Sequence, residues 1–402
     1  MLAYLCSKSK LMNCILFDGT VRDALLPLTY TRPVADIRVG ILTIREKWEK
    51  HLSCTTTTLT EDYLSEKFPM VEFEANIMIN ASFIPTNSLV NKVKNLKENE
   101  AIFKSDEIVA FYTSNLQEEV DFDTYTHFEL DEDLLQIKNV WDIFSLNDAA
   151  IKLDFELLTH GRISQKISDT VHCINKDQIF LEEGASVEIA VLNASNGPIY
   201  LGKDSEIMEG CMVRGPFAIG EHSVLKMGAK IYGATTLGPH CKVGGEVNNA
   251  VFFGYSSKAH DGFLGNSVIG EWCNLGADTN NSNLKNNYAS VKLWDYESEK
   301  FKDTGLQFCG LIFGDHSKCG INTMFNTGTV VGVSANIYGG NFPRNFIPSF
   351  SWGGSAGFTT YQLPKVFEVA EKVMERRDLV FNEIDKNILQ HIFDETSKYR
   401  AQ

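Results

Sequence analysis

The sequence "LGKDSE IMEGCM VRGPFA IGEHSV LKMGAK IYGATT LGPHCK VGGEVN" (residues 201–248) carries one aliphatic residue in every six. Neither a helix nor a simple strand has this period, whereas a short flat strand followed by a corner does. Three such strands make one triangular coil of about 18 residues, with strands about 4.8 Å above those of the coil before. Chance spacing in an ordinary β-sandwich is the alternative. We therefore predict a parallel β-helix with an inward ladder of Leu201, Ile207, Val213, Ile219, Leu225, Ile231, Leu237 and Val243.

The same spacing returns at residues 313–342, where the ladder positions are Phe313, Cys319, Phe325, Val331 and Ile337. Between the two runs the interval shortens to five residues, from Ala259 to Leu264 to Ile269, beside His260. A long insertion (residues 280–310) then follows, and we expect it to loop off the solenoid and return. A broken coil is where side chains can leave the ladder and meet a ligand.

The segments on either side of the repeat have other periods. Residues 12–150 begin with the buried strand "NCILF", continue with Ile37, Ile41, Ile44 and Trp48 at helical spacing, and reach a second strand, "NIMIN". Strands alternating with helices predict a parallel α/β sheet. Residues 360–402 have apolar residues at helical spacing and predict a C-terminal helical cap. The β-helix is expected over residues 175–355, and Met12 is an alternative start.

Composition narrows the class of protein. The net charge of -15 argues against nucleic acid or an anionic membrane as the main partner. The nine cysteines include no C-x-x-C pair, as expected of reduced thiols in a cytoplasmic protein. The first residues are too short and too interrupted by lysines for a secretory signal or a membrane span.

Residues 198–350 contain "HDGFLG", "IGEWCNLGAD" and "SNLK" in that order. The order resembles the acetyltransferase half of the GlmU-like family, which joins N-acetylglucosamine-1-phosphate uridylyltransferase to glucosamine-1-phosphate acetyltransferase. The resemblance implies a left-handed β-helix, a homotrimer with active sites between subunits, and acetyl-CoA as co-substrate. It places His260, Asn274 and Asn283 at active-site positions.

These residue types fit acyl transfer. An amine must lose a proton before it attacks a thioester, and histidine is the usual base near neutral pH. Asn274 and backbone N–H groups are expected to stabilise the oxyanion. Lys258, Lys285 and Lys292 are candidate phosphate contacts. The resemblance adds two acceptor-phosphate positions, Tyr232 and Asn248, and a coenzyme A path near Gly320, Asn322, Gly339 and Gly340.

The N-terminal segment "FDGTVRDALLPLTYTRP" resembles the loop of sugar-phosphate nucleotidyltransferases. The resemblance implies nucleotide contacts from Gly19, Thr20, Arg22 and Arg32, although most of the glycine-rich cradle is missing. In "INASFIP", Ser82 stands where the family has a magnesium-binding aspartate. We therefore expect Mg²⁺ only if this short, degenerate domain is active.

The sequence predicts an α/β plus all-β protein: a short nucleotidyltransferase-like domain, a left-handed parallel β-helix and C-terminal helices. The predicted function is acyl-CoA-dependent acetyl transfer to an amino-sugar phosphate or nucleotide sugar, with His260 as base. One alternative is a sugar-1-phosphate nucleotidyltransferase whose β-helix oligomerises or regulates, and another is a non-catalytic relative. His260 as a structural residue and zinc at His222 and His240 also stay open; otherwise no metal site is expected.

Overall fold

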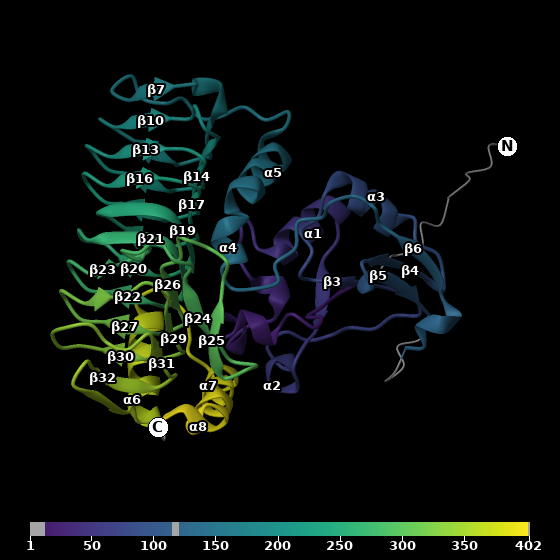
Figure 1. Ribbon diagram of the computed structural model, residues 1–402. Helices are drawn as coiled ribbons and strands as arrows, with labels where there is room; N and C mark the ends of the chain where they lie inside the picture. Colours follow the sequence, from purple (N-terminus) through teal and green to yellow (C-terminus); the bar gives the residue numbers. More distant parts are fainter. Residues whose placement is uncertain (1–12, 115–119, 401–402) are drawn as a thin grey trace.

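The structure is a computed structural model that describes residues 13–114 and 120–400. An N-terminal α/β domain lies beside a tall β-solenoid, and C-terminal helices cover the lower end of the solenoid (Figure 1). The prediction of an α/β part, a parallel β-solenoid and terminal helices is thus confirmed. Met12 lies outside the described residues.

The N-terminal sheet is mixed rather than parallel. Its strand order is β2-β1-β3-β5-β4-β6, and β5 runs antiparallel to both β3 and β4. The parallel prediction is wrong because "EAIFK" and "EIVAFYT" form a hairpin, with no helix between them to return the chain. The strands are β1 (Asn13–Phe17), β2 (Thr56–Leu59), β3 (Asn76–Asn80), β4 (Glu100–Lys104), β5 (Glu107–Thr113) and β6 (Thr126–Glu129).

Helices flank this sheet. A capping box between Thr43 and Glu46 starts helix α1 at Ile44, so Ile37 and Ile41 precede the helix instead of continuing its face. The helices are α1 (Ile44–Leu52), α2 (Asp62–Ser65), α3 (Asn87–Lys94), α4 (Asp142–Ser145) and α5 (Asn147–Thr159). The 3₁₀ turns are η1 (Asp23–Leu25), η2 (Leu28–Tyr30), η3 (Val34–Asp36), η4 (Phe122–Thr124) and, in the solenoid, η5 (Lys176–Gln178).

The solenoid has three parallel faces. Face A consists of β7 (His172–Ile174), β10 (Val191–Asn193), β13 (Met212–Arg214), β16 (Lys230–Tyr232), the first halves of β19 (Glu246–Gly254) and β21 (Phe263–Glu271), β23 (Asn280–Asn281) and β28 (Met324–Phe325). Face B consists of β8 (Ile179–Leu181), β11 (Ile199–Leu201), β14 (Phe217–Ile219), β17 (Thr235–Leu237), the second halves of β19 and β21, β26 (Leu311–Phe313), β29 (Thr329–Val331) and β31 (Phe346–Ile347). Face C consists of β9 (Ser186–Val187), β12 (Glu206–Ile207), β15 (Val224–Leu225), β18 (Lys242–Val243), β20 (Ser257–Lys258), β22 (Asn274–Leu275), β27 (Lys318–Cys319), β30 (Asn336–Ile337) and β32 (Ser351–Gly354), to which β33 (Gly357–Thr360) adds antiparallel.

The ladder follows the predicted period. Leu201 pairs with Ile219 and Ile219 with Leu237, so each coil of this run advances by 18 residues. All eight predicted ladder residues of the first run are at most 2% exposed. The second run keeps the same register, with Phe313 opposite Val331 and Cys319 opposite Ile337.

The break in the repeat differs from the prediction. Lys258, rather than Ala259, pairs with Val243 and takes the inward position. The five-residue interval from Leu264 to Ile269, within β21, is as predicted. The other runs from Val247 to Phe252, within β19, instead of from Ala259 to Leu264. Each of these strands continues from face A to face B without the usual interruption, and helix α4 packs against both. The shortened coil thus lies where helix α4 of the N-terminal domain packs on the solenoid.

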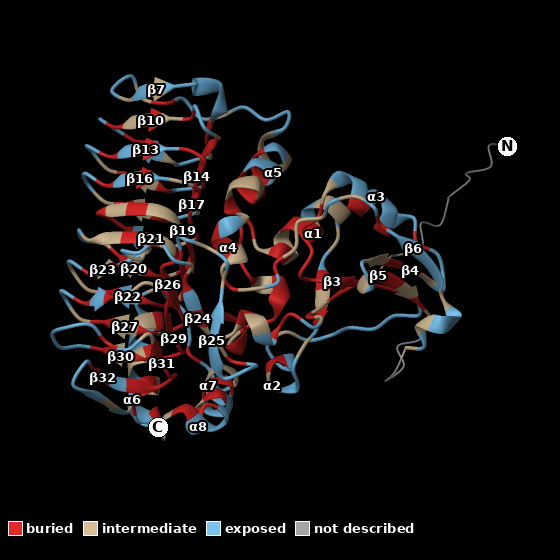
Figure 2. Ribbon diagram, viewed as in Figure 1, coloured by how far each residue is buried: buried red, intermediate tan, exposed pale blue. Residues whose placement is uncertain are grey.

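The N-terminal domain covers face B (Figure 1). Outward residues of this face, such as Val251, Val268 and Ile312, belong to the same buried cluster as the core of the N-terminal domain. Figure 2 shows the resulting buried band between the two parts, while the strands of face A are half-buried or exposed on their outer side. Face A thus stays accessible in the single chain, as do Lys242 and Asn274 on face C.

The insertion loops off the solenoid as predicted and forms the hairpin of β24 (Lys292–Asp295) and β25 (Lys300–Asp303). Its Tyr296 ring contacts Tyr30 of the N-terminal domain, Phe346 of the solenoid and Tyr399 of the C-terminal helices. The C-terminal helices are α6 (Leu363–Glu375), α7 (Glu383–Glu395) and α8 (Ser397–Arg400). The insertion therefore joins all three parts.

Candidate functional site

His260 lies at the corner between faces C and A, which we call the C/A edge. The edge passes through residues 259–262 and the equivalent corners of neighbouring coils, where Asp278 N donates to the Asp261 carbonyl (3.0 Å). His260 is exposed, and its imidazole has no hydrogen-bond or ion-pair partner among the described residues. It is therefore accessible to a ligand.

The four residues predicted for coenzyme A follow on the same edge. Asn322 N donates to the Ala277 carbonyl (2.8 Å), and Gly320 lies directly against Gly276. Gly339 and Gly340 come on the next coil and have open space where a side chain would begin. The structure thus aligns His260 with Gly320, Asn322, Gly339 and Gly340 along one accessible edge.

Face A carries the predicted acceptor contacts. Tyr232 pairs with Asn248, which pairs with Gly265 on the next coil. A Cβ atom at Gly265 would approach Asn283 Nδ2 and a Phe263 ring carbon, each to 2.6 Å, so glycine makes room for both. Asn283 Nδ2 donates to Asn266 Oδ1 (2.8 Å). These residues therefore form one strip of face A, next to the C/A edge.

Asn274 lies elsewhere. It is exposed on the outer side of face C, between Ser257 and Lys318 in register. The residue that follows His260 along the C/A edge is Ala277. The structure thus does not place Asn274 on the edge with His260 within one chain.

Lys258 points into the solenoid and is 1% exposed. Its Nζ donates to the carbonyls of His260 (2.8 Å) and Gly244 (3.1 Å). Burial lowers the pKa of Lys258 to about 8, although Asp261 and Asp278 act in the opposite direction. A phosphate outside the solenoid cannot reach this ammonium, so Lys258 instead fixes the backbone of His260. Reading the ladder onward from Val247 and Phe252 would have revealed this inward lysine.

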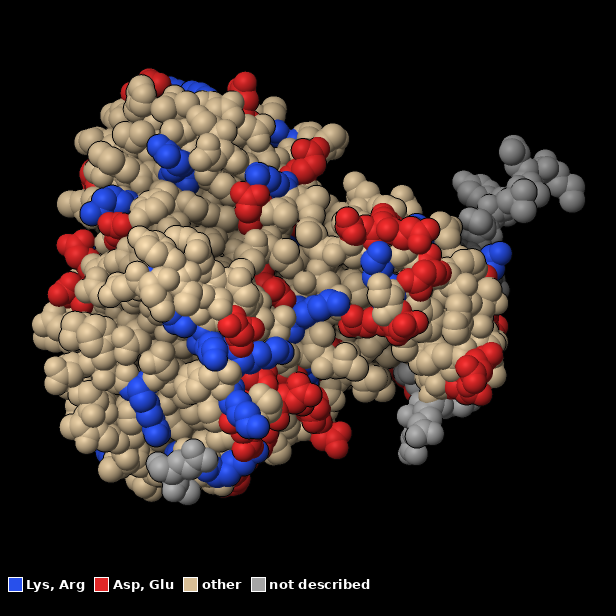
Figure 3. Space-filling model, in the orientation of Figure 1, with Lys and Arg blue, Asp and Glu red and all other residues tan. Residues whose placement is uncertain are grey.

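The other two lysines differ in their surroundings. Lys285 Nζ donates to the Ser290 carbonyl (2.6 Å) within the insertion. Lys292 is exposed on β24. Figure 3 shows basic side chains gathered around the hairpin of β24 and β25, with acidic side chains below them. Lys292 is thus more accessible to an anion than Lys258 or Lys285.

In the N-terminal domain, the loop after β1 meets the end of β3. Gly19 has φ of +64° and packs on the Asn80 amide, while Thr20 is exposed. Ser82 Oγ donates to Asn80 Oδ1 (2.8 Å) and accepts from Gln136 Nε2 (3.0 Å). Gln136 Nε2 also donates to Glu107 Oε1 (2.8 Å), so Glu107 brings a carboxylate to this cluster. The sequence did not single out Glu107, because it comes from the antiparallel hairpin.

Arg22 and Arg32 are buried and occupied by internal contacts. Arg22 pairs with Asp18 (3.1 Å) and donates to the Thr29 carbonyl (2.6 Å). Arg32 crosses to the solenoid, where it pairs with Asp315 and with Glu271. Neither guanidinium is free for a nucleotide phosphate in this arrangement.

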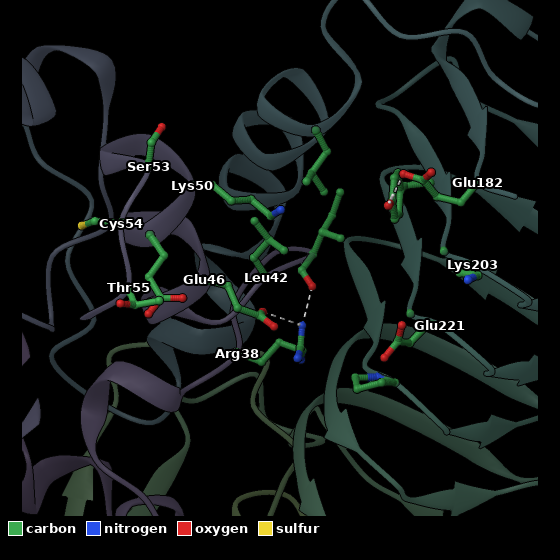
Figure 4. Close-up of a pocket in the computed structure, with 17 residues that line it drawn as sticks. Arg38, Leu42, Glu46, Lys50, Ser53, Cys54, Thr55, Glu182, Lys203 and Glu221 are labelled. Atoms are coloured by element: carbon green, nitrogen blue, oxygen red, sulfur yellow. Dashed lines mark hydrogen bonds and ion pairs between the residues drawn. The ribbon is translucent and has the colours of Figure 1, made fainter. Parts of the chain in front are cut away.

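A cavity of about 740 Å³ lies between α1 and the solenoid (Figure 4). Glu46 and Lys50 face it from the N-terminal domain, and Glu182, Lys203 and Glu221 face it from the solenoid. Its wall thus mixes both charges, and His260 is not part of its lining.

The histidines of the zinc alternative stack instead of converging on a point. The rings of His222 and His240 are 5.0 Å apart and nearly parallel, at the corner between faces B and C. Tyr255, Trp272 and His316 continue this stack. Among residues 13–114 and 120–400, no three His, Cys, Asp or Glu side chains are grouped to hold a metal ion.

The N-terminal domain is similar to a family of known proteins. Residues 14–163 match a family described as "Sugar nucleotidyl transferase". The bifunctional protein GlmU of Methanocaldococcus jannaschii is 32% identical over 92 residues, which are 23% of this chain and 22% of that protein. GlmU of Methanococcus aeolicus is 30% identical over 92 residues, with the same coverage. The chain thus joins a sugar nucleotidyltransferase domain to a parallel β-solenoid, and its resemblance to GlmU proteins is confirmed as a distant one.

The chain spans only about a fifth of the length of these curated relatives. Among solved structures, the Arabidopsis UDP-N-acetylglucosamine acyltransferase matches with 15% identity and a TM-score of 0.25, over 58% of this chain and 94% of that one. No helix in the described part of the chain is long and apolar enough to cross a membrane.

Proposed function

We propose that the protein is an acyl-CoA-dependent acyltransferase that acetylates an amino-sugar phosphate or a nucleotide sugar. The observation that carries this proposal is the accessible C/A edge, which aligns His260 with Gly320, Asn322, Gly339 and Gly340. A base beside an open strip of backbone suits a long thioester co-substrate that is held mainly by main-chain groups.

In this proposal His260 removes a proton from the acceptor amine as the amine attacks the thioester carbonyl. Histidine is the usual general base for such a proton transfer near neutral pH. Lys258 fixes the main chain at His260 from inside the solenoid, which limits the movement of the base. Backbone N–H groups of the edge, or Asn274, would stabilise the oxyanion.

The acceptor would lie on face A, beside Tyr232, Asn248 and Asn283. Lys292, with Lys285 behind it, is the proposed source of positive charge for a phosphate. We retain a homotrimer in this proposal, because face A stays open in the single chain and the exposed Asn274 on face C would need a neighbouring subunit to join the site. We also retain the cytoplasmic location. Light scattering checks the trimer, and a monomer at micromolar concentration would contradict a shared site.

A mass-spectrometric screen tests the activity. Acetyl-CoA is incubated with a panel of amino-sugar phosphates and amino-sugar nucleotides, and a product heavier by one acetyl group is expected for at least one acceptor. The His260→Ala protein is the matched control. No product from any acceptor class would contradict acetyl transfer.

A second candidate is nucleotidyl transfer by the N-terminal domain. It is favoured by the family match over residues 14–163 and by the cluster of Asn80, Ser82 and Glu107. Mg²⁺ prefers carboxylates, and Glu107 is the one that this cluster offers. Pyrophosphate release from a nucleoside triphosphate and a sugar 1-phosphate, lost in Glu107→Gln, would support this function. If neither activity is found, the non-catalytic alternative is favoured.

A further inference from the structure

Two cysteines of the N-terminal domain contact each other as free thiols. Cys14 lies on strand β1, and Cys54 follows Ser53, the left-handed residue (φ +57°) that ends helix α1. Cys14 is opposite Thr56 in the ladder of β1 and β2, which brings the segment around Cys54 beside β1. Both side chains pack in one cluster, and the Cys14 thiol donates a hydrogen bond to the Cys54 sulfur. A short approach of the two sulfur atoms would convert this contact into a disulfide.

The two thiols differ in their access to solvent. Cys14 is fully buried, whereas Cys54 is half-buried and lines the cavity of about 740 Å³ between α1 and the solenoid. Figure 4 shows the Cys54 sulfur turned away from Lys203 and Glu221, which face the cavity from the solenoid. The thiol thus lies on the N-terminal side of the cavity, on which Cys14 also lies. A small oxidant in the cavity can reach Cys54 but not Cys14.

The surroundings of Cys54 activate its thiol. The hydrogen bond from Cys14 and the nearby Lys94 ammonium lower the pKa of Cys54 to about 7, although burial and Glu49 act in the opposite direction. Lys94 is held at the end of helix α3 by a hydrogen bond from its Nζ to the His51 carbonyl (2.7 Å). The thiolate is the form of cysteine that reacts with peroxides. Cys54 therefore has the charge state of an oxidation target near neutral pH.

Cys14 has the properties of a second reactant. Its hydrogen bond to Cys54, followed by burial, raises its pKa, so Cys14 keeps its proton while Cys54 is a thiolate. Oxidation of Cys54 removes the anion that holds this proton. The same contact thus keeps Cys14 unreactive before Cys54 is oxidised and places it next to the oxidised sulfur afterwards.

We propose that Cys54 is a site of oxidation by hydrogen peroxide and that Cys14 converts the product into an intramolecular disulfide. The Cys54 thiolate attacks one peroxide oxygen, the O–O bond breaks, and the departing hydroxide takes up a proton to give water. The Cys14 sulfur then attacks the sulfur of the Cys54 sulfenic acid. The S–O bond breaks, and the departing hydroxide takes the Cys14 proton to give a second water. The peroxide is reduced, and the protein loses two hydrogen atoms.

The disulfide joins the end of helix α1 to strand β1. Ser53 and Thr55, the neighbours of Cys54, also line the cavity, so the oxidised protein has a changed cavity wall. A disulfide that forms only under oxidative conditions is the kind expected in a protein whose thiols are otherwise reduced. This modification does not depend on the proposed acetyl transfer.

Intact-mass spectrometry of the full-length protein tests the proposal, before and after treatment with hydrogen peroxide. We expect a loss of about 2 Da that dithiothreitol reverses, and peptide mapping under non-reducing conditions should find Cys14 joined to Cys54. No cross-link would overturn the proposal. A cross-link of Cys54 to another cysteine, such as Cys6 outside the described residues, would overturn the assignment of Cys14.

The Cys14→Ser variant separates the two steps. Its hydroxyl can still donate to Cys54 but cannot form a disulfide, so the Cys54 sulfenic acid should accumulate and react with dimedone. Cys54→Ser should give neither the cross-link nor the dimedone adduct. Cys173→Ser, which removes a half-buried thiol of the solenoid, is the matched control and should leave the cross-link unchanged. A dimedone adduct that persists in Cys54→Ser at an undiminished level would overturn Cys54 as the target.

A measurement on the unmodified protein does not depend on how the variants fold. Burial raises the pKa of Cys173, whereas that of Cys54 is lowered. At pH 7, iodoacetamide should therefore alkylate Cys54 at least about fivefold faster than Cys173, as followed by peptide mass spectrometry. Equal rates would overturn the activation of Cys54 on which the proposal depends.

Discussion

Face B and the C/A edge belong to the same coils but differ in what they present outward. On face B, Val268 is 0% exposed, because the N-terminal domain covers it. On the open faces, Met212 is 61% exposed, and His260 on the C/A edge is also exposed. The same inward ladder runs through all these coils and sets the fold. The outward residues differ, because those of face B pack against the N-terminal domain and those of the C/A edge form the candidate active site.

Replacement of His260 on the C/A edge is expected to have the largest effect. In His260→Ala, acetyl transfer is expected to fall by about 10² to 10⁴, the usual contribution of a general base. Thermal stability should barely change, because the imidazole is exposed and has no partner among the described residues. His222→Ala, an exposed histidine of another corner, is the control for both measurements. Near-normal turnover in His260→Ala would remove this residue from the mechanism.

The Arg32→Met variant tests how much the contact between the N-terminal domain and the solenoid contributes to stability. This change leaves Asp315 and Glu271 without their buried partner, so we expect the free energy of unfolding to fall by about 3–5 kcal/mol. Urea denaturation measures the loss. Arg162→Met breaks an ion pair with Glu182 in which the arginine side chain is 48% exposed, and it should cost at most about 1 kcal/mol. Equal losses in the two variants would mean that the domain junction adds nothing to stability.

Lys258 differs from the exposed lysines of the solenoid because its side chain lies inside the coils. Its pKa is lowered to about 8 by burial, against about 10.4 when unfolded. Between these values the unfolded chain binds the extra proton, so the contribution of Lys258 to stability rises with pH, by at most about 1.4 kcal/mol per pH unit. Stability relative to Lys258→Met should therefore increase from pH 8 to pH 10. The exposed Lys230→Met should show no such trend, and a flat difference for Lys258→Met would contradict the lowered pKa.

The smallest effect is expected at Asn274. Because this residue lies on face C and not on the C/A edge of its own chain, and because backbone N–H groups of the edge can also stabilise the oxyanion, Asn274→Ala should lower turnover less than tenfold. A loss comparable to that of His260→Ala, in a protein that light scattering shows to be a trimer, would indicate that face C completes the site of a neighbouring subunit.

The sequence predicted the solenoid well because a six-residue period needs only one aliphatic residue per strand. The same rule did not predict that Lys258 points inward. Its ammonium donates to main-chain carbonyls, and no residue pattern reveals these contacts. It also misplaced the first of the two shortened intervals, and it did not predict the contact of β19 and β21 with helix α4, which is distant in the sequence. His260 was singled out from its local motif, whereas the position of Glu107 depends on contacts between segments that are distant in the sequence.

Tyr296 has a consequence for how the molecule unfolds. Repeat proteins whose units contact only their neighbours can lose coils progressively from either end. Here one aromatic residue of the insertion contacts the N-terminal domain, the solenoid and the last helix. Fraying of the C-terminal coils would therefore withdraw a contact from the N-terminal domain as well. The chain is built from repeats, yet its cooperativity should be that of a single globular unit.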